Sequence, residues 1–316
     1  MLAIETEGLT KDFLVGFWRP RPYRALDQLT LAVEPGEVFG FLGPNGAGKS
    51  TAIKLLMQLI FPTSGTARIL GKPVGDVATR RRIGFLPENP SFYEYLTAEE
   101  LLRYFASLFD MPAAERTARV ARVLDEVGLG AERRMRLRSY SKGMIQRLGI
   151  AQAILNEPEI VFFDEPMSGL DPLGRRDVRQ LMLRLRDSGC TVFFSSHILA
   201  DAEAICSQVA VIAQGKLAGA GRLADLLSAD VLGWELVVDR VSPEALAALR
   251  ARARTVTELH DGRYTVDLPP EDPDAALQQL SAAGARVVSL NPLRTTLEDY
   301  FVQHVSRAAA REIAAQ

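Results

Sequence analysis

One nine-residue stretch constrains the fold of this chain more than any other feature. It fits the pattern G-x-x-x-x-G-K-[ST], in which a glycine-rich turn is followed by a lysine and a hydroxyl residue. Its members are Gly43, Pro44, Asn45, Gly46, Ala47, Gly48, Lys49, Ser50 and Thr51. An apolar run over 37–42 precedes the stretch, and apolar residues at helical spacing follow it over 52–60. Strand, turn and helix in this order are the context that a phosphate-binding loop requires.

The residue types in this loop suit a nucleoside triphosphate. The glycines let consecutive backbone N–H groups face one anion, and the N-terminus of the following helix adds a positive partial charge. Lys49 is expected to reach the β- and γ-phosphates, and the Ser50 hydroxyl is expected to bind Mg²⁺. A chance glycine turn before a core helix is the alternative, but it does not account for nine residues in the required context. We therefore expect the chain to bind a nucleoside triphosphate.

Charge, cysteine content and hydropathy narrow the function classes. The chain has 316 residues, enough for about two domains, and its formal net charge of −2 gives no reason to expect nucleic-acid binding. Cys190 and Cys206 form no C-x-x-C pair, so a reducing cytoplasm is the simplest compartment. The first residues lack the pattern of a signal peptide, and no apolar run approaches the roughly 18 residues of a membrane helix. Work at a membrane would therefore require a partner.

The spacing of apolar residues predicts an alternating α/β domain over about 1–230. Strands are expected at 4–13, 26–33, 37–42, 66–70, 83–86, 160–163, 191–194 and 208–213. Between them, about 90–155 is expected to form a helical insert with helices at 101–109, 113–127 and 142–155. A capping box, Thr97 with Glu100, precedes the first of these helices.

A second, smaller domain is predicted over 231–316. From Trp234 the expected elements follow the order βαββαβ, which is the ferredoxin-like α+β pattern, and an additional helix is expected at 296–305. This segment has no phosphate loop, acid–base pair or metal-ligand cluster, so we expect an accessory or regulatory role. One face of the last helix carries Leu297, Tyr300, Phe301 and Val305. It is expected to dock on the first domain or on the same segment of a second subunit, which would tether a dimer; the alternative is that it closes the domain's own core.

Two acidic residues follow the strand expected at 160–163. Ligands of α/β sheets bind at the carboxyl ends of the strands, so Asp164 and Glu165 are expected close to the phosphate loop. Asp164 is expected to hold Mg²⁺ through water, and Glu165 to polarise the water that attacks the γ-phosphate. An acidic pair after a strand is common in turns, so the prediction depends on its combination with the glycine-rich loop.

At this point the sequence resembles the ATPase subunits of ABC transporters over Leu2 to about Leu227. A specific marker is the segment Tyr140-Ser141-Lys142-Gly143-Met144, which resembles the family signature Leu-Ser-Gly-Gly-Gln and departs from it at three positions. The resemblance implies that Ser141 and Gly143 contact the γ-phosphate of ATP bound by the opposite subunit. A serine-capped helix is the structural alternative.

Three further roles come from the resemblance. His197, after a strand and two serines, matches the histidine that contacts the γ-phosphate, and Ser168–Asp171 matches the loop that links the two ATP sites. Glu88 stands where glutamine is usual and would offer an oxygen to Mg²⁺ or water. Phe13 is the candidate for stacking on adenine. Trp18 and Tyr23 are its rivals, and a core role for Phe13 is the other alternative.

The aromatic and basic segment over 14–24 is expected to form a loop or an edge hairpin, because it contains Pro20 and Pro22. Its function is open between contact with lipid head groups, contact with a membrane partner, and an exposed loop without a role.

The resemblance implies a Mg²⁺-dependent ATPase that acts as an ATP-sandwich homodimer and drives a separate polytopic membrane permease. Such a subunit would be cytoplasmic and peripheral to the inner face of the cell membrane. Segments 83–88 and 297–301 resemble the exporter branch in which ATPase and permease are separate chains. The alternatives are a soluble ATPase of DNA repair or translation, and a nucleotide-gated module without hydrolysis.

Overall fold

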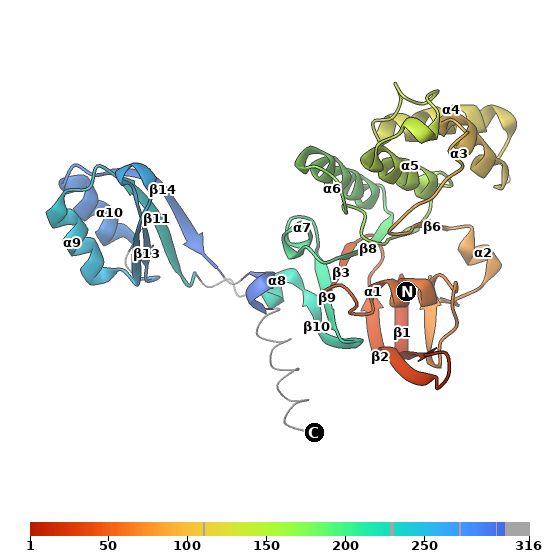
Figure 1. Ribbon diagram of the computed structural model, residues 1–316, viewed down its shortest axis with the longest axis horizontal. Helices are drawn as coiled ribbons and strands as arrows, with labels where there is room; N and C mark the ends of the chain where they lie inside the picture. The colour runs from red at the N-terminus through yellow and green to blue at the C-terminus, as the bar shows by residue number, and fades with distance from the viewer. Residues whose placement is uncertain (110, 228–230, 272, 295, 301–316) are drawn as a thin grey trace. The chain divides into compact units, whose positions relative to one another are not determined.

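The computed structural model describes residues 1–109, 111–227, 231–271, 273–294 and 296–300 (Figure 1). The chain divides into two compact units, Met1–Leu223 and a second that begins at Ala224. The domain boundary expected near residue 230 lies outside the described residues and stays a prediction. Among the helices of the described ranges, none has both the length and the apolar character needed to cross a membrane.

A six-stranded sheet organises the first unit, with strand order β10-β9-β3-β8-β7-β6. The five strands from β9 to β6 are parallel, and β10 pairs antiparallel with β9. The strands are β3 (Val38–Leu42), β6 (Ile83–Leu86), β7 (Ile160–Phe163), β8 (Thr191–Ser196), β9 (Gln208–Ala213) and β10 (Lys216–Arg222). The sequence analysis did not predict β10, because glycines and alanines make up most of its length and give no strand pattern.

An antiparallel sheet of order β2-β1-β4-β5 forms the second layer of this unit. Its strands are β1 (Ile4–Val15), β2 (Arg21–Val33), β4 (Ser64–Ile69) and β5 (Lys72–Pro73). Strands β1 and β2 are longer than predicted and pair up to Val15 opposite Arg21. The segment over 14–24 is therefore the edge hairpin, one of the two forms expected for it.

Helix α1 (Lys49–Leu56) shares one apolar core with both sheets. Ile53 of α1, Leu29 of β2 and Phe41 of β3 are all fully or almost fully buried in this core. The helix ends earlier than its apolar spacing predicted, at the C-cap Met57. Because strand, loop and helix are anchored in one core, the loop between β3 and α1 is held on a rigid base.

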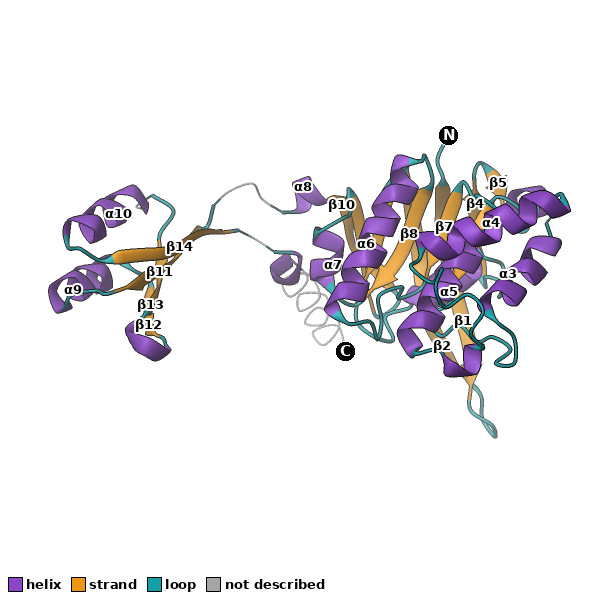
Figure 2. Ribbon diagram, turned by 90° about the horizontal axis from the view of Figure 1, so that it is seen from above, coloured by secondary structure: helices purple, strands orange, loops and turns teal. Residues whose placement is uncertain are grey.

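The helical insert contains α3 (Ala98–Ser107), α4 (Ala113–Glu126) and α5 (Lys142–Ile154), which pack on one another (Figure 1). A short helix, α2 (Val77–Arg80), precedes β6. The predicted capping box begins α3: Thr97 Oγ1 accepts the Glu100 N–H, and the Glu100 carboxylate accepts the Thr97 N–H. Helices α6 (Pro172–Asp187) and α7 (Leu199–Glu203) follow β7 and β8, and α6 packs against β8 (Figure 2).

The second unit has the predicted βαββαβ order after α8 (Leu223–Leu226). Its elements are β11 (Gly233–Asp239), α9 (Pro243–Arg252), β12 (Thr255–Glu258), β13 (Tyr264–Leu268), α10 (Pro273–Ala282) and β14 (Arg286–Leu293). The strands form an antiparallel sheet of order β12-β13-β11-β14 around a small apolar core of its own. Residues 297–300 are helical, whereas the rest of the helix expected at 296–305, with Phe301 and Val305, lies outside the described residues.

Candidate functional site

The glycine-rich loop leaves the carboxyl end of β3 and is pressed against two neighbouring strands. A Cβ on Gly43 would lie 2.2 Å from the carbonyl oxygen of Ile212 in β9, and one on Gly48 would lie 2.5 Å from that of Ala25 in β2. Gly48 also has a φ of 106°, in the left-handed region that favours glycine. Gly43 is therefore required for the close approach of β9, and Gly48 both for the approach of β2 and for its backbone conformation.

Strand register brings the first acidic residue to this loop. Strands β7 and β8 pair in parallel with Phe163 opposite Phe194, so the next residues, Asp164 and Ser195, are neighbours at the sheet edge. The Ser195 hydroxyl donates to Asp164 Oδ1 at 2.7 Å, and the Ser50 hydroxyl of the loop donates to the same oxygen at 3.2 Å. The structure thus brings together two of the three predicted Mg²⁺ ligands, Ser50 and Asp164, although 114 positions separate them in the chain.

Glu165 lies between a buried cation and an imidazole. Its Oε1 is 3.2 Å from Lys49 Nζ, and its Oε2 is 2.8 Å from His197 Nδ1. The side chains of Lys49 and Glu165 are buried, whereas that of His197 is 40% exposed. Lys49 Nζ also donates to the carbonyl oxygens of Gly43 at 2.7 Å and Pro44 at 3.1 Å. Burial strengthens the attraction between the carboxylate and the ammonium, because little water screens it.

The backbone around Glu165 is fixed by two residues that the sequence analysis did not select. Glu165 has a φ of 51°, and its N–H donates to Ser195 Oγ at 2.9 Å. The buried Gln146 of α5 donates from Nε2 to the carbonyl oxygens of Pro166 at 3.2 Å and Glu165 at 3.4 Å. A polar residue among the apolar positions of a helix was the available signal for Gln146. The signal for Ser195 was weaker: it is a small hydroxyl residue near the end of a strand.

A pocket of about 330 Å³ opens above the loop and contains most of the predicted nucleotide-binding residues. Phe13 and Tyr23 line it as a cross-strand pair of β1 and β2, and Glu88 lines it from the segment after β6. Lys11 Nζ lies 5.1 Å from the centroid of the Phe13 ring. Trp18, the other candidate for stacking on adenine, does not line this pocket. The remaining lining residues are Ala25, Asn45, Gly46, Ala47, Gly48, Lys49, Ser50, Thr51 and Glu165.

The residues of the signature-like segment do not line this pocket. Ser141 is the N-cap of α5, and its hydroxyl accepts the N–H of Met144 at 3.2 Å. Gly143 lies beside the segment before α6, since a Cβ there would be 3.2 Å from Leu170 Cδ2. Ser141 is exposed, and Gly143 is half-buried. A role for them at a bound nucleotide would therefore require a second subunit.

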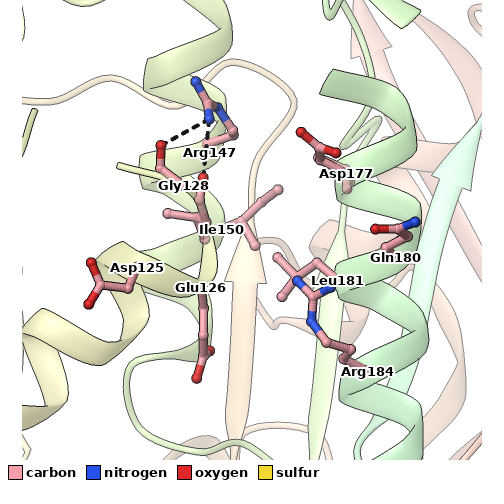
Figure 3. Close-up of a pocket in the computed structure, with 11 residues that line it drawn as sticks. Asp125, Glu126, Gly128, Arg147, Ile150, Asp177, Gln180, Leu181 and Arg184 are labelled. Carbon is pink, nitrogen blue, oxygen red and sulfur yellow. Dashed lines mark hydrogen bonds between the residues drawn. The ribbon is translucent and has the colours of Figure 1, made fainter. Parts of the chain in front are cut away.

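A second pocket, of about 170 Å³, lies between the end of α4, α5 and α6 (Figure 3). Arg147 of α5 donates to the carbonyl oxygens of Val127 at 3.3 Å and Gly128 at 3.2 Å. Asp177 and Arg184 of α6 line the opposite side (Figure 3). This pocket shares no lining residue with the pocket above the loop. Arg147 stabilises the C-terminal end of α4, where carbonyl oxygens lack partners within the helix.

The oxygen atoms around the loop suit a magnesium ion better than a metal held by protein side chains alone. No group of three or more His, Cys, Asp or Glu residues that could hold a metal ion occurs within the described ranges. Mg²⁺ typically keeps several waters and binds through one or two protein oxygens together with substrate phosphates. Ser50 Oγ and Asp164 Oδ1 are such oxygens, and Glu88 lines the same pocket as Ser50.

Known proteins resemble the chain along most of its length. A family model described as ABC transporter matches residues 26–168. An uncharacterised ABC transporter ATP-binding protein of Synechocystis sp. is 45% identical over 305 residues, which cover 96% of this chain and 84% of that protein. The bacitracin transport ATP-binding protein BcrA of Enterococcus faecalis is 33% identical, and the match covers 95% of both chains. The daunorubicin/doxorubicin resistance ATP-binding protein DrrA of Streptomyces peucetius is 35% identical, with 95% and 91% covered.

A solved structure extends the comparison to the fold. It is the dimeric structure of an ATP-binding cassette in a post-hydrolysis state, bound to ADP and phosphate. It matches with a TM-score of 0.64 and 26% sequence identity, over 70% of this chain and 98% of that chain.

Proposed function

Because this chain belongs to the ATP-binding subunits of ABC transporters, we propose that its ATPase cycle drives export through a separate membrane permease. ABC-type ATP hydrolysis and the cassette fold come with the family. One observation carries the assignment of the chemistry to this site: the Glu165 carboxylate lies between Lys49 and His197, beside the Ser50–Asp164 pair. Export is supported by the two relatives whose names connect them with bacitracin transport and drug resistance.

Binding of ATP is assigned to the loop and to Lys49. The backbone N–H groups of the loop and the N-terminus of α1 would face the phosphates. In this structure Lys49 Nζ donates hydrogen bonds to the carbonyl oxygens of Gly43 and Pro44 and forms an ion pair with Glu165. On binding it would exchange part of this set for phosphate oxygens, which are stronger partners than neutral carbonyls. Phe13 and Tyr23 offer aromatic faces to the adenine.

Activation of the attacking water is assigned to Glu165. Its Oε1 has no geometrically satisfactory hydrogen bond although it is buried. A buried carboxylate oxygen without a hydrogen bond is suited to accept a proton or to orient a water. His197 holds the other oxygen at 2.8 Å and would thereby fix the direction of the carboxylate. We further assign to His197 the contact with the γ-phosphate in the ATP-bound state.

Mg²⁺, when bound, would neutralise part of the charge that develops on the phosphates. The Ser50 hydroxyl and the Asp164 carboxylate would hold it, and the carboxylate of Glu88, which lines the same pocket as Ser50, would be a further oxygen ligand. Ser195 donates to the same Asp164 oxygen as Ser50 does, so it would orient the carboxylate rather than contact the ion.

A homodimer is proposed to complete each ATP site. Ser141 and Gly143 do not line their own chain's pocket, so we assign their contact with ATP to the pocket of a partner subunit. The dimeric cassette structure supports this arrangement. The permease would hold the dimer at the cytoplasmic face of the membrane and convert its closing and opening into transport. No nucleic acid is required by any of these steps.

Isolation of the complex from native membranes tests the proposal. The tagged full-length chain is purified in detergent, co-purifying polytopic membrane proteins are identified, and the complex is reconstituted in vesicles. We expect a polytopic partner, and ATP-dependent uptake of cargo into those vesicles in which the ATPase faces outward. Recovery of the chain without any polytopic protein, or ATP-driven movement toward the ATPase side, would contradict export through a permease.

A further inference from the structure

The tip of the β1–β2 hairpin exposes two neighbouring aromatic side chains. Phe17 and Trp18 are 92% and 90% exposed, and their rings touch each other edge to face with centroids 5.5 Å apart. Leu14 and Val15, at the end of β1, are exposed as well. Single apolar side chains on a surface need no explanation, but four exposed ones within five residues concentrate apolar surface at the end of the hairpin.

Two arginines without acidic partners adjoin this patch. Arg19 and Arg21 are exposed, and within the described part of the chain neither forms an ion pair. Arg24, nearer the body of the sheet, differs from them: its guanidinium contacts Asp12 at 2.9 Å and Asp27 at 3.1 Å. The hairpin therefore carries an apolar tip followed by two uncompensated positive charges, whereas the positive charge closer to the pocket is neutralised.

The shape of the hairpin favours a broad surface over a groove in a protein. Strands β1 and β2 pair up to Val15 and Arg21, and residues 16–20 form the turn. Figure 2 shows this two-stranded end extending beyond the sheets of the first unit. A projecting ribbon presents its apolar residues at a convex end. Such an end can enter a fluid interface without a complementary cavity, whereas a protein partner would have to provide a pocket for two large rings.

We propose that this hairpin binds directly to a membrane surface that carries anionic lipid head groups. Phe17 and Trp18 enter the boundary between head groups and acyl chains, where the apolar phenyl ring is buried and the amphipathic indole ring is favoured. Arg19 and Arg21 remain at the level of the lipid phosphates and contact them with their guanidinium groups. The contact is additional to the proposed permease and requires neither ATP nor a second subunit.

Tryptophan fluorescence provides a direct test on the full-length protein. The chain contains two tryptophans, and Trp234 is partly buried with its indole N–H bonded to the Pro270 carbonyl oxygen. In a Trp234→Phe variant, the emission comes from Trp18 alone. We expect a blue shift with vesicles that contain phosphatidylglycerol, and quenching when their acyl chains carry bromine. Unchanged emission with these vesicles would overturn the proposal.

Vesicle sedimentation separates the apolar and the charge contributions. Arg19→Gln with Arg21→Gln should lower binding at least tenfold, because each basic side chain near an anionic surface contributes substantially. Arg19→Lys with Arg21→Lys should retain most of it. Phe17→Ser with Trp18→Ser should abolish binding but leave ATPase activity in solution unchanged, since neither residue lines the nucleotide pocket. Leu173→Ser, at an equally apolar exposed position on α6, is the matched control.

Comparing vesicle binding with co-purification of the permease shows whether the hairpin contacts lipid or a protein. If the Phe17→Ser/Trp18→Ser protein binds vesicles like the native chain but no longer co-purifies with the permease, the hairpin binds a protein and the lipid proposal is wrong. Loss of vesicle binding with an intact permease complex supports it. The ATPase assignment is untouched by either result, because the vesicle assays need no nucleotide.

Discussion

The backbone and the side chain of Glu165 are both held by contacts with other residues. Ser195 binds its N–H, Gln146 contacts its carbonyl oxygen, and Lys49 and His197 flank the two carboxylate oxygens. A positive φ is uncommon for a residue other than glycine, and it persists only where surrounding contacts determine the conformation. This arrangement fits a carboxylate whose direction must be fixed before ATP binds.

Glu165→Gln should separate ATP binding from hydrolysis. Glutamine keeps the size and most of the hydrogen bonding but cannot accept a proton, so turnover should fall by about 10² to 10⁴ while ATP affinity is retained. The ATP-bound variant should run as a dimer in gel filtration. Steady-state ATPase measurements and equilibrium binding of ATP check the two parts. Near-normal turnover would show that another group activates the water.

Lys49→Ala should act at nucleotide affinity. The substitution removes a buried cation that contacts the loop carbonyls and Glu165, so binding of an ATP analogue should weaken by at least tenfold. Lys54→Ala is the matched control, because Lys54 is an exposed lysine on the same helix. Equilibrium titration with a fluorescent analogue measures both variants. Equal affinities of the Lys49→Ala and Lys54→Ala variants for the analogue would show that Lys49 does not contribute to nucleotide binding.

Some residues of the candidate site could be predicted from local sequence patterns. Others could not, because their contacts join segments that are distant in the sequence. The glycine-rich loop and the Asp164–Glu165 pair follow apolar strands, so their chemistry can be read along the chain. Ser195 acts on Asp164 only because β7 and β8 are adjacent in register, and Gln146 reaches Glu165 from a helix in the insert. No local pattern contains those two relationships. The individual roles proposed for the site residues remain predictions.

Among the elements, helix α3 begins with the capping box that the sequence predicted. Thr97 and Glu100 exchange hydrogen bonds with each other's backbone N–H groups. The hydrogen bond from the Thr97 N–H holds the pKa of the Glu100 carboxyl below its ordinary value. A lowered pKa in the folded state means that this carboxylate stabilises the helix end at neutral pH and loses that effect as the pH falls through the folded-state value.

Thr97→Ala should destabilise the start of α3 by about 1 kcal/mol, the usual effect of losing an N-cap. Thr97→Ser should retain the cap. Hydrogen exchange of the first α3 amides measures this local stability without assuming two-state unfolding of the whole chain. In Glu100→Gln, the acid-induced loss of protection that is expected for the native helix start should be absent. Exchange that is equally fast in Thr97→Ala and Thr97→Ser would contradict the capping contribution.

Elements that depend on a partner were harder to predict than self-contained helices. The ends of β1 and β2 extend through a segment with two prolines because each strand supplies the other's hydrogen-bond partners. Strand β10 forms on the edge of β9 despite Gly219 and Gly221. In both places the backbone pairing of a neighbour, rather than side-chain pattern, decides the structure.

For the whole molecule, the phosphate loop together with the family resemblance predicted the α/β cassette, and the order of elements predicted the ferredoxin-like sheet of the second unit. Contacts between subunits are beyond what one chain's pattern of apolar residues contains. The same holds for the permease, because its contacts are encoded in two sequences. A complementation experiment can test the first of these relationships.

A mixed dimer of Lys49→Ala and Gly143→Asp chains should recover activity that neither homodimer shows. In this dimer one composite site keeps a native loop from one chain and a native Ser141–Gly143 segment from the other. Partial ATPase activity is expected if one site can turn over alone. If every mixture is inactive, cross-linking a Ser141→Cys chain to a cysteine placed near Gly46 distinguishes strict coupling of the sites from a wrong subunit arrangement.

The second unit is expected to act on the dimer and not on ATP. It has its own core around Leu236, Leu249 and Val266, and none of its described residues lines the nucleotide pocket. Leu297, at the start of the last described helical residues, is fully buried, and the Thr296 hydroxyl caps them by accepting the N–H of Asp299 at 3.2 Å. We therefore expect this helix to be anchored, and the stripe that continues to Phe301 and Val305 stays a prediction for subunit contact.

Deletion of everything after residue 230 should leave nucleotide binding intact, because every residue assigned to phosphate contact lies upstream. Self-association without nucleotide should weaken, since the proposed tether between subunits would be lost, and transport by the reconstituted complex should become uncoupled from hydrolysis. Analytical ultracentrifugation measures the first effect, and the ratio of transported cargo to hydrolysed ATP measures the second. Leu297→Ser with Tyr300→Ser in the full-length chain is the more selective variant. A truncated chain that self-associates and transports like the full-length protein would show that the second unit does not tether the dimer.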